Sequence, residues 1–442
     1  MSQIVILGNG IAGITAARHI RKRSDQSITI VSGETDHFFS RTALMYIYMG
    51  HMKYEHTKPY EDWFWEKNNL QLKRGWVKTI DFDHKKLLLE KEELAYDKLI
   101  LAVGSKPNKF GWPGQDLNGV QGLYSYQDLE QLEDNTKGIQ EAVIVGGGLI
   151  GIELSEMLHS RHIPVTYLVR EQHFWNNVLT DRESRLIDTH IRENGIDLRL
   201  ETNLEEIIDD GNGKVAGVRT AGGEKIDCQF VGLTVGVSPN IEFLKNSALE
   251  TDKGILVDDY LQTNIPDVYA LGDCAQLRNP KPGRRAIEAV WYTGRLMGET
   301  VALTLTGQQT SYNPGPWFNS AKFYDIEYQT YGNVANTPGP GEQHFVWQGA
   351  DGKRSLTINY NEADHTVLGV NVLGIRMRHE VWESWLRDRV QLGYVIQHLK
   401  KANFDPEFFK QHDIEIQEEY NRQFPDKPIA QRKKTFLEKI FA

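Results

Sequence analysis

The chain has 442 residues, of which 25% are charged and 40% hydrophobic, and its formal net charge is −10. This composition is typical of a globular protein, and the acidic balance argues against nucleic acid as a general partner. No apolar run in the sequence reaches the roughly 18 to 20 residues that span a bilayer, and no signal-peptide profile precedes the first apolar segment, so we expect a cytoplasmic protein without a membrane span. At about 150 residues per domain, the length predicts about three domains.

The first predicted element is a strand over residues 4–7, followed at once by the sequence GNGIAG at residues 8–13 and by a helical pattern. A turn from strand to helix that seats a dinucleotide pyrophosphate needs glycines at fixed places. Gly8 would make the turn, and Gly10 would let the phosphates reach backbone N–H groups at the helix N-terminus. Gly13 would let the helix pack closely on its strand.

Glu34 comes just after a predicted strand over residues 28–31. It stands where a dinucleotide-binding unit carries an acidic residue that holds a ribose hydroxyl, and the alternative is an ordinary loop carboxylate. Further on, a predicted strand over residues 98–103 leads into Gly104, and Pro113 and Gly114 mark a domain boundary.

A second glycine motif of the same design follows a predicted strand over residues 142–145. It reads GGGLIG over residues 146–151, so Gly146, Gly148 and Gly151 take the same three roles. One such motif is weak evidence, whereas two in strand, turn and helix context are much stronger. A chain that holds two dinucleotides is most simply interpreted as passing a hydride between them.

The type of nicotinamide cofactor stays open in the sequence. The predicted strand over residues 165–169 ends in Arg170 and Glu171. Arg170 could meet the 2′-phosphate of NADPH, and Glu171 could accept a hydrogen bond from the 2′-hydroxyl of NADH. We favour NADPH slightly, and at least one of the two charges is expected to be a solvated loop residue.

The segment up to residue 310 contains further short strands, the last of which, over residues 268–270, precedes Gly272 and Asp273. From residue 311 the pattern changes to that of an antiparallel sheet, with alternation over 323–331 and hairpin turns at 351–352 and 361–364. A helical spacing then joins the apolar residues Val381, Trp385, Leu392 and Ile396.

The C-terminal tail carries the basic cluster Arg432, Lys433 and Lys434, followed by apolar residues. These apolar residues are Phe436, Leu437, Ile440 and Phe441. We expect them to dock on their own chain, and the alternative is a surface that faces a partner or a membrane.

Five motifs occur in one order, and together they carry a family resemblance. They are Gly8 to Gly13, Ala102-Val103-Gly104, Gly146 to Glu153, Gly236 to Asn240 and Leu271-Gly272-Asp273. With them the chain resembles the pyridine nucleotide-disulfide oxidoreductase superfamily over residues 1–310. It is most similar to the branch of ferredoxin and rubredoxin reductases and the FAD module of nitrite reductase.

The resemblance implies an α/β fold of two Rossmann-like dinucleotide-binding domains, the FAD domain being discontinuous, plus a C-terminal α+β domain with an antiparallel sheet. The implied bounds are 1–112 and 244–310 for the FAD domain, 113–243 for the NAD(P)H domain and 311–442 for the C-terminal domain with its helical tail.

The resemblance also implies positions for both cofactors, FAD and NAD(P)H. The residues expected along FAD are Gly8, Gly10, Ala12, Gly13, Glu34, Arg41, Ala102, Val103, Gly104, Gly272, Asp273 and Trp291. The residues expected along NAD(P)H are Gly146, Gly148, Leu149, Ile150, Gly151, Glu153, Arg170 and Gly236. Arg41 would lie near the FAD pyrophosphate, and Glu153 beside the nicotinamide amide as the residue assigned to catalysis. For Trp291 plain core packing is an equal alternative, and Glu153 could be a carboxylate that is favoured only by the helix dipole.

The sequence departs from the family pattern at two places. Disulfide-reducing members carry a reactive cysteine where this chain has residues 42–45, TALM, and ferredoxin reductases tend to place a lysine where Tyr46 stands. The chain has two cysteines, Cys228 and Cys274, which form no CxxC or CxxxxC pair. We therefore expect no redox-active disulfide, and no metal site.

The expected function is that of an FAD-dependent NAD(P)H oxidoreductase that passes electrons to a small redox protein such as a ferredoxin or rubredoxin. Trp317 and Phe318 are candidates for its docking surface, although such aromatics are more often core residues. A reductase of a quinone or oxygen is one alternative, and a nucleotide-sensing interaction protein without turnover is another. The oligomeric state stays open.

Overall fold

The computed structural model describes residues 2–404 and 408–430, and the chain divides into two compact units. The first unit comprises Met1–Leu168 with Thr202–Pro314, and the second comprises Val169–Glu201 with Gly315–Ala442. The predicted tail cluster from Arg432 to Phe441 lies outside the described residues. The predicted division into FAD, NAD(P)H and C-terminal domains stays a prediction.

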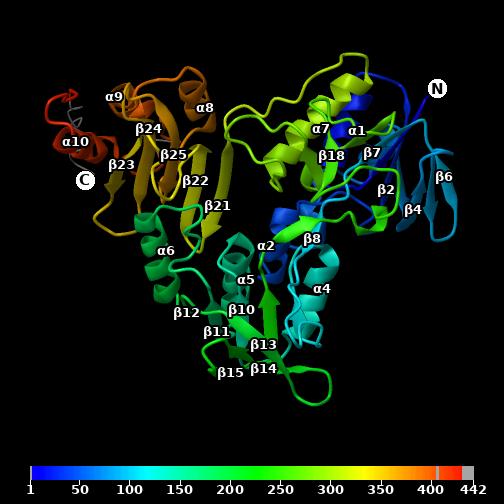
Figure 1. Cartoon of the computed structure of the whole chain (residues 1–442), viewed down its shortest axis with the longest axis horizontal. Helices are drawn as coiled ribbons and strands as arrows, with labels where there is room; N and C mark the ends of the chain where they lie inside the picture. Colours follow the sequence, from blue (N-terminus) through cyan, green and yellow to red (C-terminus); the bar gives the residue numbers. More distant parts are fainter. Residues whose placement is uncertain (1, 405–407, 431–442) are drawn as a thin grey trace. The chain divides into compact units, whose positions relative to one another are not determined.

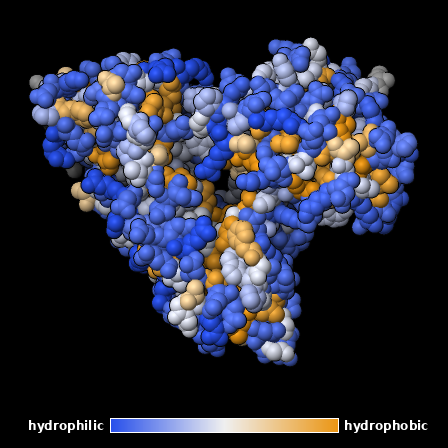
Figure 2. All heavy atoms as spheres, in the orientation of Figure 1, coloured by the Kyte–Doolittle hydropathy of each residue, from blue (hydrophilic) through white to orange (hydrophobic). Residues whose placement is uncertain are grey.

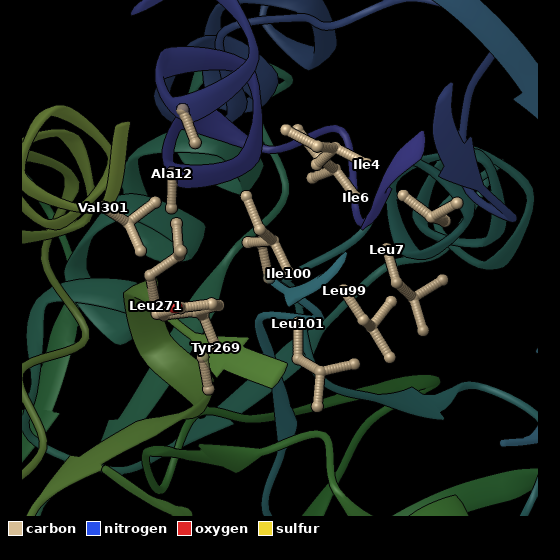
Figure 3. Close-up of a cluster of buried hydrophobic side chains, with 14 of the residues drawn as sticks. Ile4, Ile6, Leu7, Ala12, Leu99, Ile100, Leu101, Tyr269, Leu271 and Val301 are labelled. Atoms are coloured by element: carbon tan, nitrogen blue, oxygen red, sulfur yellow. The ribbon is translucent and has the colours of Figure 1, made fainter. Parts of the chain in front are cut away.

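A parallel sheet forms the N-terminal part of the first unit (Figure 1). Its strand order is β19-β7-β1-β2-β3, with bounds Val268–Ala270, Lys98–Leu101, Gln3–Leu7, Ser27–Ser32 and Leu70–Arg74. The apolar residues of β1 and β7 are buried, which explains their continuous apolar sequences (Figure 3). Helix α1 (Ile11–Arg21) packs against α7 (Trp291–Leu305), so that a Cβ at Gly298 would lie 2.6 Å from the carbonyl oxygen of Ala12.

A second run of parallel strands lies in the same unit, in the order β11-β10-β16-β9. Their bounds are Val165–Leu168, Ala142–Val145, Phe230–Leu233 and Val120–Gln121. Helix α5 (Leu149–Ser160) follows β10 directly, and α4 (Tyr126–Asn135) precedes it. Both glycine motifs therefore connect a strand to a helix, as the sequence predicts.

Shorter elements complete the first unit. The helices are α2 (Leu44–Tyr48) and α3 (Trp63–Lys67), with 3-10 turns η1 (Arg41–Ala43), η2 (Tyr54–Thr57), η3 (Glu242–Leu244) and η4 (Gly272–Cys274). Antiparallel strands are β4 (Val77–Asp81), β5 (Lys86–Leu89) and β6 (Glu93–Ala95), then β13 (Leu204–Asp209), β14 (Val215–Thr220) and β15 (Lys225–Asp227). Two strand pairs join β8 (Ser105–Pro107) to β17 (Val237–Pro239) and β18 (Ile255–Val257) to β20 (Ala275–Leu277).

The second unit is built on an antiparallel sheet in the order β21-β22-β25-β24-β23. The bounds are Phe318–Phe323, Ile326–Gly332, Val367–Leu373, Ser355–Asn361 and Glu342–Gln348. The other elements are α6 (Asp181–Glu193), β12 (Asp197–Arg199), α8 (His379–Arg387), α9 (Leu392–His398), η5 (Leu399–Ala402) and α10 (Asp413–Gln423). One apolar cluster joins residues of β22 to β25 with residues of α8, α9 and α10.

The C-terminal sheet and its hairpin turns at 351–352 and 361–364 are confirmed. Two details differ from the sequence pattern. The alternating segment 323–331 contains a tight turn at Tyr324 and Asp325, where Tyr324 has φ +55°. The predicted helical stretch is divided into α8 and α9.

The predicted α/β class with parallel sheets and a C-terminal antiparallel sheet is confirmed. Hydrophilic residues cover most of the face shown in Figure 2, in keeping with the charged fraction of the chain. Among the described residues, no helix has both the length and the apolar character needed to cross a bilayer.

Candidate cofactor-binding sites

In the first glycine turn, backbone conformation or packing requires glycine at Gly8 and Gly13 but not at Gly10. Gly8 has φ +115°, and a Cβ there would lie 2.1 Å from the carbonyl oxygen of Ala102. A Cβ at Gly13 would lie 2.2 Å from the carbonyl oxygen of Gly8. Gly10, in contrast, has an ordinary φ of −70°, and a Cβ there would meet nothing within 4 Å in the described chain beyond its immediate neighbours.

The second glycine turn repeats this division. Gly146 has φ +119°, and a Cβ there would lie 2.6 Å from the carbonyl oxygen of Thr234. A Cβ at Gly151 would lie 2.2 Å from the hydroxyl of Tyr167. Gly148 has φ −123°, and the space beside it is open in the described chain. In both turns the outer glycines serve the fold, and the central glycine leaves room for a ligand.

The helices that follow both turns present free N-termini. Gly10 and Gly148 are the N-cap residues of α1 and α5, and no side chain of the described residues caps either helix. The first backbone N–H groups of a helix have no partner inside the helix, and the helix dipole favours an anion beside them. Leu149 and Ile150, predicted as NAD(P)H contacts, supply the first two residues of α5. Both turns therefore fit a pyrophosphate group.

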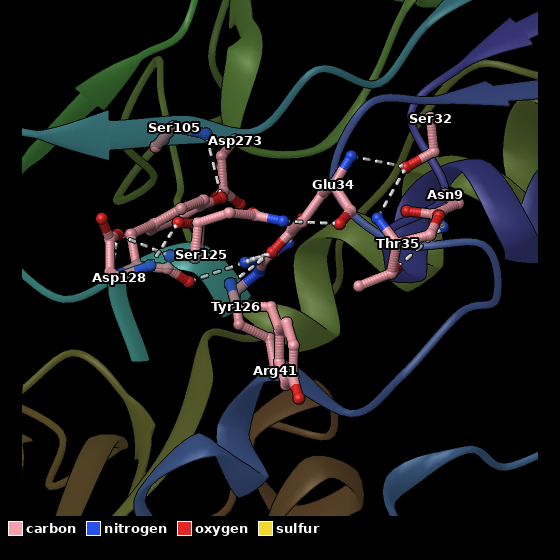
Figure 4. A network of polar contacts seen from close by, with 12 residues as sticks. Asn9, Ser32, Glu34, Thr35, Arg41, Ser105, Ser125, Tyr126, Asp128 and Asp273 are labelled. Carbon is pink, nitrogen blue, oxygen red and sulfur yellow. Dashed lines mark hydrogen bonds and ion pairs between the residues drawn. The ribbon is translucent and has the colours of Figure 1, made fainter. Parts of the chain in front are cut away.

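Charged and polar side chains gather beside the first turn (Figure 4). The Arg41 guanidinium donates to both carboxylate oxygens of Glu34, with N–O distances of 2.7 and 2.6 Å. The backbone N–H of Tyr126 also donates to Glu34, at 2.9 Å. Asn9, inside the glycine motif, donates to the carbonyl oxygen of Thr35 at 2.9 Å and so holds the loop that carries Glu34.

Two further sequence motifs, Ala102-Val103-Gly104 and Gly272-Asp273, lie beside the first glycine turn. Gly272 has φ +73°, and a Cβ there would lie 2.9 Å from the Cβ of Ala12. Asp273 follows directly, and burial raises the pKa of its carboxyl above the usual range. The N–H of Ala102 donates to the carbonyl oxygen of Leu7, which fixes the segment of Ala102, Val103 and Gly104 beside β1.

Trp291 begins α7, and the N-terminal part of that helix lies near Ala12, because a Cβ at Gly294 would be 3.4 Å from the Ala12 Cβ. Gly236 lies between β16 and β17 with φ +90°, a conformation that favours glycine. Arg170 and Glu171 belong to the second unit, where the Arg170 Nε donates to the Glu171 carboxylate at 2.7 Å.

Glu153 lies in α5, two residues beyond the second motif. Burial, together with the nearby charge of Glu156, raises the pKa of its carboxyl to about 7. Within the described part of the chain, the Glu153 carboxylate has no ion-pair or hydrogen-bond partner, and Tyr46 instead stacks on His51 with ring centroids 6.2 Å apart. A carboxyl with such a pKa can keep its proton and donate a hydrogen bond near neutral pH.

Both cysteines are free and buried. Burial raises the pKa of the Cys228 and Cys274 thiols to about 12. A thiol with this pKa stays protonated at neutral pH and is a poor nucleophile.

Sequence reasoning missed Tyr124, which touches several of the predicted residues. Its hydroxyl donates to Asp273 at 3.0 Å, and its backbone carbonyl accepts from Arg41 at 2.6 Å. No local motif marks this tyrosine, because its partners lie far away along the sequence.

The profile of the family described as "Pyridine nucleotide-disulphide oxidoreductase" matches residues 2–295. The chain belongs to this family. The predicted resemblance is therefore confirmed, and the family is one of oxidoreductases that depend on FAD and NAD(P)H.

The chain is also similar to two curated proteins of known name. The chain is 31% identical over 281 residues to a nitrite reductase [NAD(P)H] of Bacillus subtilis. The aligned region covers 62% of this chain and 34% of that protein. The chain is 30% identical over 344 residues to the rhodocoxin reductase of Rhodococcus erythropolis, covering 75% of this chain and 78% of the relative. Among solved structures, a ferredoxin reductase of Rhodopseudomonas palustris superimposes with a TM-score of 0.77 at 23% identity, over 85% of this chain and 91% of that one.

Proposed function

We propose that this oxidoreductase binds FAD at the first glycine turn and NAD(P)H at the second, and passes electrons to a small redox protein without a redox-active disulfide. The observation that carries the proposal is the pair of central glycines, Gly10 and Gly148. Neither backbone conformation nor packing requires glycine at these two positions. Close approach of a ligand to the backbone would explain why both positions are glycine.

Five of the predicted site residues take a specific role in this proposed function. Glu34, Arg41 and Asp273 would hold the ribose, pyrophosphate and ribityl parts of FAD, and Gly236 and Glu153 would lie along the nicotinamide half of NAD(P)H. The donor chemistry fits, because three hydrogen bonds reach Glu34 and a carboxylate offers about four acceptor sites. One site remains for a ribose hydroxyl.

When bound, FAD supplies hydride acceptance from NAD(P)H and release of single electrons. The residues of the chain contribute binding and orientation, and no protein nucleophile is needed. The N-termini of α1 and α5 would hold the two pyrophosphates. Glu153 would keep a proton on its carboxyl below about pH 7 and donate a hydrogen bond toward the carboxamide.

The choice of a protein acceptor is supported by the named relatives, which include a rhodocoxin reductase and NADH-rubredoxin oxidoreductase. Trp317 and Phe318, proposed at the docking surface, are part-buried, and Phe318 packs on His379 with ring centroids 4.0 Å apart. The cytoplasmic location stays a prediction, and so does NADPH as the nicotinamide cofactor.

Two matched variants test the assignment of the pockets. Gly10→Val and Gly148→Val place the same side chain into the two open spaces, and both chains should fold like the wild type. Gly10→Val should lose FAD, measured by the flavin absorbance of the purified protein.

Gly148→Val should keep FAD. Its flavin should be reduced by NAD(P)H at least about a hundredfold more slowly in stopped-flow absorbance, because about 3 kcal/mol of the binding free energy of NAD(P)H is lost. Loss of FAD in Gly148→Val would mean that the pockets are exchanged, and full activity in both variants would refute the proposal.

The acceptor is tested by turnover of the wild-type protein. Faster reduction of a ferredoxin or rubredoxin than of a quinone or oxygen supports the proposed function. The reverse order identifies a reductase of small acceptors. A long-lived charge-transfer complex with negligible turnover on any acceptor identifies a nucleotide sensor.

A further inference from the structure

Tyr124 lies at the point where the separate motifs of the first unit meet. It precedes the N-cap residue of α4, far from the first glycine turn in the sequence. Its hydroxyl accepts a hydrogen bond from the N–H of Ser105 at 2.9 Å and donates one to Asp273 Oδ2 at 3.0 Å. The Tyr124 hydroxyl thus fixes the Asp273 carboxylate at Oδ2.

The ring and the backbone of Tyr124 hold Arg41 as well. The guanidinium carbon of Arg41 lies 4.6 Å from the centroid of the Tyr124 ring, within the range of a cation–π contact. Arg41 Nη1 also donates to the carbonyl oxygen of Tyr124. A guanidinium has five N–H donors, and three hydrogen bonds go to Glu34 and Tyr124, so two donors remain for a further anion.

Gly104 leaves space for the Tyr124 hydroxyl, and Asp128 holds the Tyr124 backbone. A Cβ at Gly104 would lie 2.7 Å from the Tyr124 hydroxyl, so the tyrosine fits because residue 104 is glycine. The Asp128 carboxylate accepts from the backbone N–H groups of Tyr124 and Ser125 and so ties the tyrosine to the capping box of α4.

The energetics argue against a role in core packing alone. The Tyr124 hydroxyl satisfies two buried polar groups, the N–H of Ser105 and the carboxylate of Asp273. A phenylalanine would fill the same space but would leave both groups without this partner. Burial raises the pKa of the Asp273 carboxyl, and the hydrogen bond from Tyr124 opposes that shift because it favours the charged form.

We propose that Tyr124 is a positioning residue for FAD, which acts by fixing the Asp273 carboxylate with its hydroxyl and the Arg41 guanidinium with its ring. The inference rests on the proposed function, because it takes the first glycine turn as the FAD site. It predicts that FAD affinity depends on the hydroxyl of Tyr124.

The test compares Tyr124→Phe with Tyr126→Phe in the full chain stripped of flavin. Tyr126 is a matched control, because its backbone N–H binds Glu34 while its ring packs on Tyr54 and Phe39. The dissociation constant for FAD is measured by fluorescence titration. Tyr124→Phe should raise it about tenfold, which corresponds to about 1.4 kcal/mol, and Tyr126→Phe should leave it within about twofold.

A double-mutant cycle separates a positioning role from general destabilisation. In the Asp273→Ala background, Tyr124→Phe should change FAD affinity less than about twofold, because its partner is already absent. A persistent tenfold loss in that background, or an unchanged affinity in the single variant, overturns the inference.

A second arm keeps the ring and the fold intact, in case Tyr124→Phe does not fold. Incorporation of 3-fluorotyrosine at position 124 makes the hydroxyl a stronger donor and should shift FAD affinity by at least about twofold, and no shift overturns the inference. Wild-type protein that binds no FAD at all would instead refute the proposed function, so the two failures are distinguishable.

Discussion

The Glu153 carboxyl gives a pH dependence of stability that can be worked out from the structure. The pKa of Glu153 is about 7 in the folded chain, against an ordinary value of 4.5. The unfolded chain therefore loses its proton first as the pH rises, and folding stability falls between about pH 4.5 and pH 7. At 1.36 kcal/mol per pKa unit, the full penalty is about 3 kcal/mol above pH 7 and less than about 1 kcal/mol at pH 5.

Glu153→Gln removes the titrating group and keeps the shape of the side chain. The variant should be more stable than the wild type by up to about 3 kcal/mol at pH 8 and by less than about 1 kcal/mol at pH 5. The measurement is thermal unfolding of the flavin-free protein from pH 5 to pH 8, where the difference at pH 8 corresponds to a gain of about 5 °C for a unit of this size.

Glu130, an exposed residue of α4, provides the control. Glu130→Gln should follow the wild-type profile over the same pH range. Parallel stability profiles of Glu153→Gln and the wild type would show that Glu153 ionises normally. Burial would then not raise the pKa of the Glu153 carboxyl.

Three further outcomes are expected. The Arg284 and Glu288 side chains form a buried ion pair, 7% and 4% exposed, so Arg284→Ala should cost about 3 to 5 kcal/mol in denaturant unfolding, and a loss below 1 kcal/mol would contradict this. Arg170→Ala should raise the KM for NADPH about tenfold and leave that for NADH within about twofold, whereas equal losses would remove the 2′-phosphate role. Replacement of both Cys228 and Cys274 by alanine should leave the turnover rate of the folded protein unchanged, and a loss of turnover without a loss of bound FAD would restore a thiol to the mechanism.

The glycine turns could be predicted from the sequence because part of their constraint is local. Gly8 has a positive φ, and a Cβ at Gly13 would meet the carbonyl oxygen of Gly8 within the same turn, so a fixed spacing encodes both requirements. The approach of Gly8 to Ala102 is not local and shows only in the folded chain. The alternation over 323–331 also predicted β structure correctly. The alternation did not reveal the turn at Tyr324, because a polar residue in a turn fits the same two-residue pattern as a polar residue on the exposed face of a strand.

The polar network could not be predicted, because its contacts join residues that are far apart in the chain. Arg41 was expected near a pyrophosphate, yet its contacts to Glu34 and Tyr124 depend on how three loops fold together. Tyr124 in turn reaches Asp273, which lies 149 positions further on. Only the folded chain shows that these groups are neighbours.

The position of β19 and α7 has a consequence for biosynthesis. Strand β19 pairs with β7, and α7 packs on α1, although both come from the last part of the first unit. While the nascent chain leaves the ribosome, β7 therefore has an open edge and α1 an uncovered apolar side until about residue 305 has emerged. Exposed edges of this kind promote aggregation, so a chain truncated before α7 should leave an aggregation-prone fragment.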